Sequence, residues 1–182
     1  MKRRTLVLIV LVIAALGGLI SLSVFAQDKL YDQKEIASDR LRIRIRAYKE
    51  NGVFIPGVYF VLQSAPVESD KWRNVITVKG DEPWPLRSEQ LGFVAPDIGY
   101  GFIGGYYMVT LDAGSNWSIW QADKNLVSDD YQKQNNLAPF IEAIHLNTDG
   151  TGRMTLHKYF AALERGPDLH TLDFGLHWEL TK

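Results

Sequence analysis

Four arginines at alternate positions are the residues of this sequence with the clearest chemical potential. They occupy every second place in a short segment whose intervening residues are apolar or small: Arg40, Arg42, Arg44 and Arg46. On a β-strand such residues share one face at intervals of about 6.6 Å, so the pattern predicts a half-buried strand with one cationic face. That face is either a docking strip for an anionic partner, such as an acidic protein or lipid headgroups, or a solvated edge strand. In the second case the charges prevent aggregation or pair with acidic neighbours.

Two aspartates stand at equivalent places in a repeated octapeptide. Residues 110–117 read T-L-D-A-G-S-N-W and residues 171–178 read T-L-D-F-G-L-H-W, with five of eight positions identical. The aspartates could be paired catalytic carboxylates. In a tight turn, however, an aspartate caps backbone N–H groups, a glycine supplies a left-handed backbone and a tryptophan packs on a neighbouring sheet. We therefore expect a structural role for the repeated positions Thr110, Asp112, Gly114, Trp117, Thr171, Asp173, Gly175 and Trp178.

The remaining polar and aromatic candidates give weaker signals. No pair among the four histidines has the tight spacing of metal ligands, and the chain has no cysteine, so we expect no metal and no cofactor. Trp84 lies between two prolines, and Trp120 lies on the strand face opposite Trp117. These two tryptophans are either exposed contacts of a binding surface or part of the packing between sheets.

The N-terminal segment 1–26 has the form of an export signal. A basic start, Met1–Arg4, precedes an apolar run from Thr5, and small or aliphatic residues precede Gln27. This pattern predicts a signal peptide cleaved after Ala26, with an uncleaved membrane anchor as the alternative. In both cases we expect the body of the protein outside the cytoplasm, in the periplasm or secreted.

Composition restricts the class of the remaining chain, residues 27–182. The 182-residue chain is 46% hydrophobic and 23% charged with no cysteine, which excludes collagen-like, disordered and disulfide-stapled proteins. Without the N-terminal segment the chain has 17 basic and 21 acidic residues, a net charge of −4. A net negative body makes a generic nucleic-acid binder a poor interpretation.

Period-two patterning and frequent glycine turns predict a nearly all-β body. An ambiguous helical stripe covers only residues 31–38, and residues 121–139 are typical of a polar linker. The second octapeptide follows its upstream turn after about nine extra residues, which we place around residues 165–168. The segments expected to be strands are 41–46, 58–62, 72–78, 91–94, 101–103, 106–111, 141–146, 153–163 and 178–180.

The octapeptides resemble the Asp-box, or bacterial neuraminidase repeat (BNR), of sialidases, sortilin-type receptors and propellers of the photosystem II assembly-factor type. Residues 91–117 are similar to one blade of the last group. The resemblance implies antiparallel blades in clear units at about 91–120 and 141–180, with a degenerate unit at about 41–79. About three units imply an incomplete propeller or open stack, a ring formed by association, or a compact sandwich.

The function that this resemblance implies is a non-catalytic, exported binding or assembly module of the cell envelope, with a protein partner and with self-association open. Its candidate surface comprises the arginines of segment 40–46 together with Trp84 and Trp120. The alternative is a glycan-binding or sialidase-related carbohydrate-active protein. A sialidase also needs three arginines for the substrate carboxylate and a tyrosine–glutamate nucleophile pair, and no arrangement in this sequence matches that set.

Overall fold

The computed structural model describes residues 28–50, 57–80, 82–122, 139–158 and 165–181. Within these residues the chain forms three four-stranded antiparallel sheets and almost no helix. In each sheet, strands that are neighbours in sequence are hydrogen-bonded neighbours in space. The predicted all-β architecture of blade-like units is therefore confirmed.

Each sheet takes its strands from one continuous stretch of the chain. Sheet 1 contains β1 (Lys29–Ala37), β2 (Leu41–Lys49), β3 (Val58–Pro66) and β4 (Arg73–Gly80). After a 3-10 turn, η1 (Ser88–Gln90), sheet 2 contains β5 (Leu91–Ala95), β6 (Ile98–Ile103), β7 (Tyr106–Thr110) and β8 (Ser118–Gln121). Sheet 3 contains β9 (Pro139–Leu146), β10 (Gly152–Lys158), β11 (Arg165–Thr171) and β12 (Glu179–Leu180).

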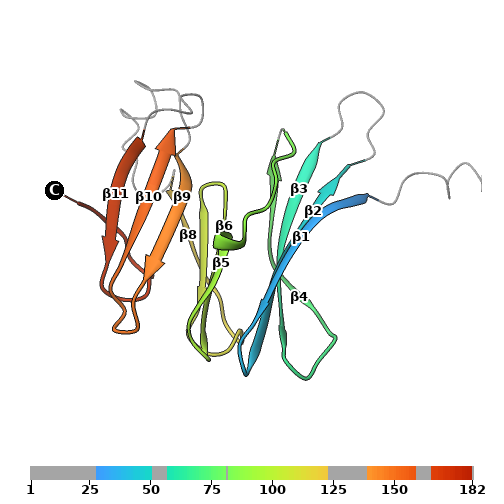
Figure 1. The fold of residues 1–182 in the computed structure, drawn as a ribbon, viewed down its shortest axis with the longest axis horizontal. Helices are drawn as coiled ribbons and strands as arrows, with labels where there is room; N and C mark the ends of the chain where they lie inside the picture. The colour runs from blue at the N-terminus through green and yellow to red at the C-terminus, as the bar shows by residue number, and fades with distance from the viewer. Residues whose placement is uncertain (1–27, 51–56, 81, 123–138, 159–164, 182) are drawn as a thin grey trace, which may run out of the picture.

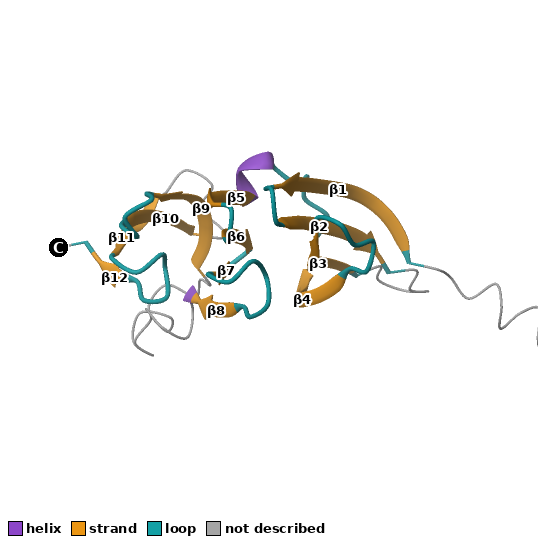
Figure 2. Ribbon diagram, turned by 90° about the horizontal axis from the view of Figure 1, so that it is seen from below, coloured by secondary structure: helices purple, strands orange, loops and turns teal. Residues whose placement is uncertain are grey.

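The three sheets lie in a row with sheet 2 in the middle (Figure 1). The view from below shows the same order, with sheet 1 and sheet 3 at opposite ends (Figure 2). Each end sheet thus has one face toward sheet 2 and one face directed away from the row.

The predicted signal segment 1–26 and most of the predicted linker 121–139 lie outside the described residues.

The arginine-bearing segment forms β2, in which apolar and arginine side chains alternate as predicted. Leu41, Ile43 and Ile45 are buried, whereas the arginines between them are half-buried on the other face. Strand β2 pairs with β1 on one side and with β3 on the other. The interpretation of these arginines as a solvated edge strand is therefore wrong, because β2 is an inner strand whose backbone hydrogen bonds are made on both sides.

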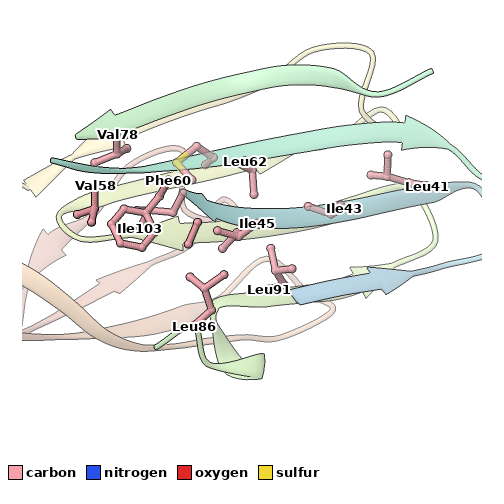
Figure 3. Close-up of a cluster of buried hydrophobic side chains, with 12 residues drawn as sticks. Leu41, Ile43, Ile45, Val58, Phe60, Leu62, Val78, Leu86, Leu91 and Ile103 are labelled. Carbon is pink, nitrogen blue, oxygen red and sulfur yellow. The ribbon is translucent and has the colours of Figure 1, made fainter. Parts of the chain in front are cut away.

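Apolar side chains fill the space between sheet 1 and sheet 2 (Figure 3). Sheet 1 contributes residues of β2, β3 and β4, and sheet 2 contributes residues of β5, β6 and β7. The buried members of this cluster are Leu41, Ile43, Ile45, Ala47, Val58, Phe60, Leu62, Val78, Leu86, Leu91, Ile103 and Met108. Burial of this apolar surface joins the two sheets and is the main favourable contribution to their association.

A second cluster joins sheet 2 to sheet 3. It uses the opposite face of sheet 2, because alternate residues of β6 and β7 point to opposite sides. Its buried members are Phe102, Tyr107, Val109, Trp120, Ala122, Ile141, Met154, Leu156, Leu169 and Trp178. The middle sheet is therefore buried on both faces, which explains why its strands lack a clear alternation of apolar and polar residues.

Two glycines of β6 allow the middle sheet to approach sheet 1 closely. A Cβ atom on Gly99 would lie 2.6 Å from Cδ1 of Ile43 and 2.9 Å from Cε1 of Phe93. A Cβ atom on Gly101 would lie 2.9 Å from Cδ1 of Leu62. Side chains of sheet 1 and of β5 occupy the space that these two glycines leave open.

Two segments differ from the sequence-based expectation. Residues 31–38, which are ambiguous for a short helix, lie mostly in β1, because pairing with β2 satisfies their backbone. Residues 165–168, expected to hold the extra length of the second repeat, are the first residues of β11. Arg165 and Asp168 pair with β10, with a register irregularity between them, and Leu169 after them is buried in the second cluster. Because residues 159–164 lie outside the described residues, the place of the extra length stays a prediction.

We expect the substitution Gly99→Ala to lower the free energy of unfolding by about 1–3 kcal/mol, the usual cost of overpacking a close-packed core. The added methyl group must displace the buried Ile43 and the ring of Phe93. Urea denaturation measures the change. Gly105→Ala, at a glycine whose φ is not positive, is the matched control. Equal stability of the two variants would contradict the close approach of the sheets.

Candidate functional site

The two aspartate octapeptides form turns with the same internal hydrogen bonds, and we call residues 110–117 and 171–178 the two Asp turns. In the first, the Thr110 hydroxyl donates to Oδ1 of Asp112 (2.9 Å) and accepts the N–H of Gly114 (2.8 Å). The carboxylate of Asp112 accepts the backbone N–H of Asn116 at 2.8 Å and its side-chain amide at 2.7 Å. The carboxylate thus caps the turn that joins β7 to β8.

The second Asp turn repeats this network between β11 and β12. The Thr171 hydroxyl donates to Oδ1 of Asp173 (2.8 Å) and accepts the N–H of Gly175 (2.9 Å). Asp173 accepts the N–H of His177 at 3.0 Å, and its Oδ2 lies 2.6 Å from Nδ1 of that histidine. Both turns need a left-handed glycine, with φ of +82° at Gly114 and +86° at Gly175.

Hydrogen bonding changes the acidity of both carboxyls. The pKa of Asp112 is lowered, chiefly because the backbone N–H and the side-chain amide of Asn116 stabilise its charged form. At Asp173 burial acts to raise the pKa, but hydrogen bonds from His177 and Thr171 outweigh it, so this pKa is also lowered. Because their oxygens already accept these bonds, both carboxylates serve the fold, as expected from the sequence.

Each Asp turn lies against the sheet that precedes it. Arg73 of sheet 1 donates to the backbone oxygens of Gly114 and, at 3.1 Å, of Ser115. In sheet 2 the Tyr107 hydroxyl donates to the carbonyl of Phe174 at 2.6 Å. Tyr107 is fully buried, and burial raises its pKa well above the usual value, so this hydroxyl keeps its proton.

The tryptophans that end the two Asp turns also pack toward the preceding sheet. Trp117 packs against the first core cluster. Trp178 is buried and meets Tyr107 edge-on, with ring centroids 5.5 Å apart. Their indole N–H groups are both buried without a hydrogen-bond partner among the described residues. The two Asp turns therefore share the burial of an unpartnered indole N–H group as well as their hydrogen bonds.

The outward face of sheet 1 is the candidate functional site, and we name it the arginine face for Arg42, Arg44 and Arg46 of β2. The Arg44 guanidinium lies over the ring of Trp72, 3.8 Å from its centroid, and that of Arg42 lies 4.9 Å from the same ring. The Arg46 guanidinium lies 5.2 Å from the ring centroid of Tyr48. A guanidinium group that lies over an aromatic ring can still use its N–H groups as hydrogen-bond donors.

Neighbouring polar groups fix the positions of two of these arginines. Nε of Arg44 donates to Oε1 of Gln63 at 2.7 Å. Arg42 donates to the carbonyl of Ser69 at 2.5 Å and lies 3.2 Å from Oδ1 of Asp70. The Arg42–Asp70 pair is the neighbour pairing that the sequence left open. These bonds orient the arginines before any partner is present.

The arginine side chains of this face are partly shielded from solvent. The Nε atoms of Arg42 and Arg46 are buried and have no hydrogen-bond partner among the described residues. Burial first, and then the charges of Arg46 and Arg42, lower the pKa of Arg44, with Glu35 opposing them. The main cause of this lowered pKa is therefore loss of solvent around the guanidinium group, with a smaller contribution from the neighbouring arginines.

Arg40 does not lie on the arginine face, although the alternate spacing of the four arginines in the sequence predicts one shared face. It precedes β2 and donates to both carboxylate oxygens of Asp97 in sheet 2, each at 2.8 Å. Its side chain is 64% exposed, and this bidentate pair links sheet 1 to the β5–β6 turn. The strand period applies only inside β2, so it could not place a residue that lies before the strand.

The two candidate tryptophans lie in the packing between elements. Trp120 is 7% exposed and belongs to the cluster between sheets 2 and 3, so its interpretation as an exposed contact is wrong. Trp84 stacks on Phe60 with ring centroids 4.2 Å apart and meets Phe140 edge-on. Trp72, which the sequence analysis places in the degenerate unit and at the start of the expected strand 72–78, is an aromatic residue of the arginine face. Its place directly before a strand, like that of Trp117, is the signal that could have identified it.

No metal-ligating cluster is formed within the described residues. They contain no group of three or more histidine, cysteine, aspartate or glutamate side chains placed to hold a metal ion. All four histidines belong to the part of the sequence that forms sheet 3. Among the described segments, no helix has the length and apolar character needed to cross a membrane.

Comparison of the chain with protein-family models, with curated proteins and with solved structures finds no match.

The substitutions Asp112→Asn and Asp173→Asn test the role of the Asp turns. A carboxyl whose pKa is lowered by folding stabilises the fold above its unfolded pKa of about 3.9, and this stabilisation is lost as the pH falls through the folded pKa. We therefore expect both variants to be less stable than the wild type at pH 7, with the difference shrinking at lower pH. Urea denaturation in neutral and acidic buffer measures both.

Asp39→Asn, at an exposed aspartate outside the turns, is the matched control for this pair. A stability loss in the turn variants that is the same at neutral and acidic pH would contradict the role of the charged carboxylates. If both turn variants were as stable as the wild type at neutral pH, the capping role would be wrong.

Proposed function

We propose that this protein is a non-catalytic, exported binding or assembly module of the cell envelope that engages an acidic protein partner through its arginine face. One observation carries the proposal. Three arginines lie on one face of the inner strand β2. Aromatic rings and hydrogen bonds hold Arg42 and Arg44 in place. Preorganised guanidinium groups lose little conformational entropy on binding carboxylates.

The charge distribution supports an acidic partner. Residues 27–182 are net negative, yet the arginine face concentrates three arginines against two acidic residues, Glu35 opposite Arg44 and Asp70 beside Arg42. A local field of this sign steers an acidic partner toward the arginine face.

The Asp turns support the non-catalytic part of the proposal. The oxygens of Asp112 and Asp173 accept hydrogen bonds within their own turns. A general acid or base must instead reach a substrate proton. Trp84 and Trp120, the two tryptophans considered for a binding surface, pack against other elements. The export part of the proposal comes from the basic and apolar pattern of residues 1–26.

Binding of fluorescently labelled poly-L-glutamate to the purified full-length chain tests the proposal. We expect the double variant R42Q/R44Q to bind at least about tenfold more weakly, equivalent to about 1.4 kcal/mol. We expect wild-type affinity to fall steeply with salt, because the screening length shrinks from about 10 Å at 0.1 M to about 3 Å at 1 M. Fluorescence anisotropy measures both.

The matched control is R42K/R44K, which keeps both charges but not the planar stacking on Trp72. It should retain the salt dependence of the wild type and part of its affinity. Unchanged binding of the glutamine variant at low salt would show that the arginine face is only a solvated surface.

A fluorogenic sialoside assay tests the absence of glycosidase activity. We expect no turnover by the wild-type chain, because the two Asp turns hold their carboxylates as backbone caps. Turnover that disappears in Asp112→Asn, while the variant keeps its fold by circular dichroism, would overturn the non-catalytic assignment.

A further inference from the structure

The contact between successive sheets is made twice in the same way. The Asp turn of sheet 2 places Gly114 against sheet 1, where a Cβ atom would lie 2.7 Å from Cδ1 of Leu41. The Asp turn of sheet 3 places Gly175 against sheet 2, where a Cβ atom would lie 2.5 Å from the ring of Tyr107. In both contacts a backbone carbonyl of the turn accepts a hydrogen bond from the preceding sheet.

In sheet 1 the connection between β3 and β4 corresponds to the Asp turns, but no described sheet precedes sheet 1. Residues 67–72 connect β3 to β4 and end in Trp72, directly before β4, just as Trp117 and Trp178 directly precede β8 and β12. The other two tryptophans pack toward a preceding sheet. Trp72 lies instead under Arg42 and Arg44, on the face directed away from the row.

Sheet 3 lies at the other end of the row, and no described turn packs on its outward face. We name it the histidine face, because the register places four polar residues in one line across its strands. These residues are His145, Arg153, His170 and Glu179. They alternate with the buried Met154 and Leu169, so they point away from sheet 2.

A hollow at one end of the histidine face corresponds to the place where a turn lies on sheet 1. It has a volume of about 280 Å³ and is lined by His170, Thr171, Leu172, Asp173, His177 and Glu179. The pair His170–Glu179 is the counterpart of Ser64–Arg73, since each is the strand pair nearest the connection. Arg73 is the residue that binds the turn of the following sheet.

The charges of the two end faces have opposite sign. The arginine face carries three arginines, against Glu35 opposite Arg44 and Asp70 beside Arg42. On the histidine face Asp168 and Glu179 outnumber Arg153, which is paired with Asp168. The Glu179 side chain is 80% exposed and lies 3.6 Å from His170. A cationic outward face and an anionic outward face at the two ends of one molecule are complementary.

We infer that the histidine face receives the arginine face of a second copy of this chain, so that copies associate head to tail. The inference rests on the proposed function and identifies its acidic partner as another copy. The β3–β4 connection of one copy, residues 67–72, lies over the hollow beside His170 and Glu179 of the next. Such a heterologous contact either closes into a ring or extends into a filament.

Sedimentation velocity of the full-length chain over a wide range of concentration tests the inference. We expect the mass to exceed one chain and to rise with concentration, with an association at least about tenfold weaker in 1 M than in 0.1 M salt. The variants R42Q/R44Q, at the arginine face, and E179R, at the histidine face, should each remain monomeric. Glu89→Arg on η1, which reverses an exposed charge outside both faces, should associate like the wild type.

Mixing the two defective variants gives the decisive result. The E179R chain keeps its arginine face and the R42Q/R44Q chain keeps its histidine face, so an equimolar mixture should form a one-to-one dimer and nothing larger. That dimer also shows that both variants are folded. Failure of the mixture to form a dimer would overturn the inference, as would association of E179R alone.

These experiments distinguish a failure of the self-association inference from a failure of the proposed function. If the wild type is monomeric at every concentration but binds poly-L-glutamate through Arg42 and Arg44, the second copy is wrong and the proposed function stands. If neither self-association nor poly-L-glutamate binding depends on these arginines, both proposals are wrong.

Discussion

The fold depends on one repeated constraint, which is that each Asp turn must lie flat against the sheet before it. A carboxylate inside the turn satisfies its backbone N–H groups, so the carbonyls of Gly114 and Phe174 are free to face the neighbouring sheet. Left-handed glycines at Gly114 and Gly175 keep that surface free of side chains. The apolar clusters then close on either side of sheet 2, and with no cysteine in the chain this packing takes the place of disulfides.

The same constraint gives the arginine face its character. Inside the row, a tryptophan at the end of a turn is covered by the preceding sheet, as Trp178 is by Tyr107. At the start of the row Arg42 and Arg44 cover Trp72. A guanidinium group can stack on an aromatic ring and still present donors to water or to a partner, which an aliphatic side chain cannot do. A surface that covers apolar groups is therefore also a surface able to bind anions.

Sequence patterns predicted the parts of the fold that depend on short-range chemistry. Alternation in segment 40–46 placed Ile43 and Ile45 in the core, and the octapeptides placed Asp112 and Asp173 in tight turns. The patterns failed where pairing decides the outcome. Residues 165–168 have no apolar alternation and are still a strand, because β10 offers hydrogen-bond partners on the adjacent edge.

The sequence by itself determined the strand faces, the two turns and the cationic character of β2, because these follow from side-chain period and from residues within eight positions of one another. Only the tertiary structure decided that β2 is an inner strand, that Arg40 turns away to Asp97 and that Trp120 is buried while Trp72 supports the arginines. These outcomes depend on which sheet lies against which. Packing between segments distant in sequence sets that arrangement, and local pattern carries no record of it.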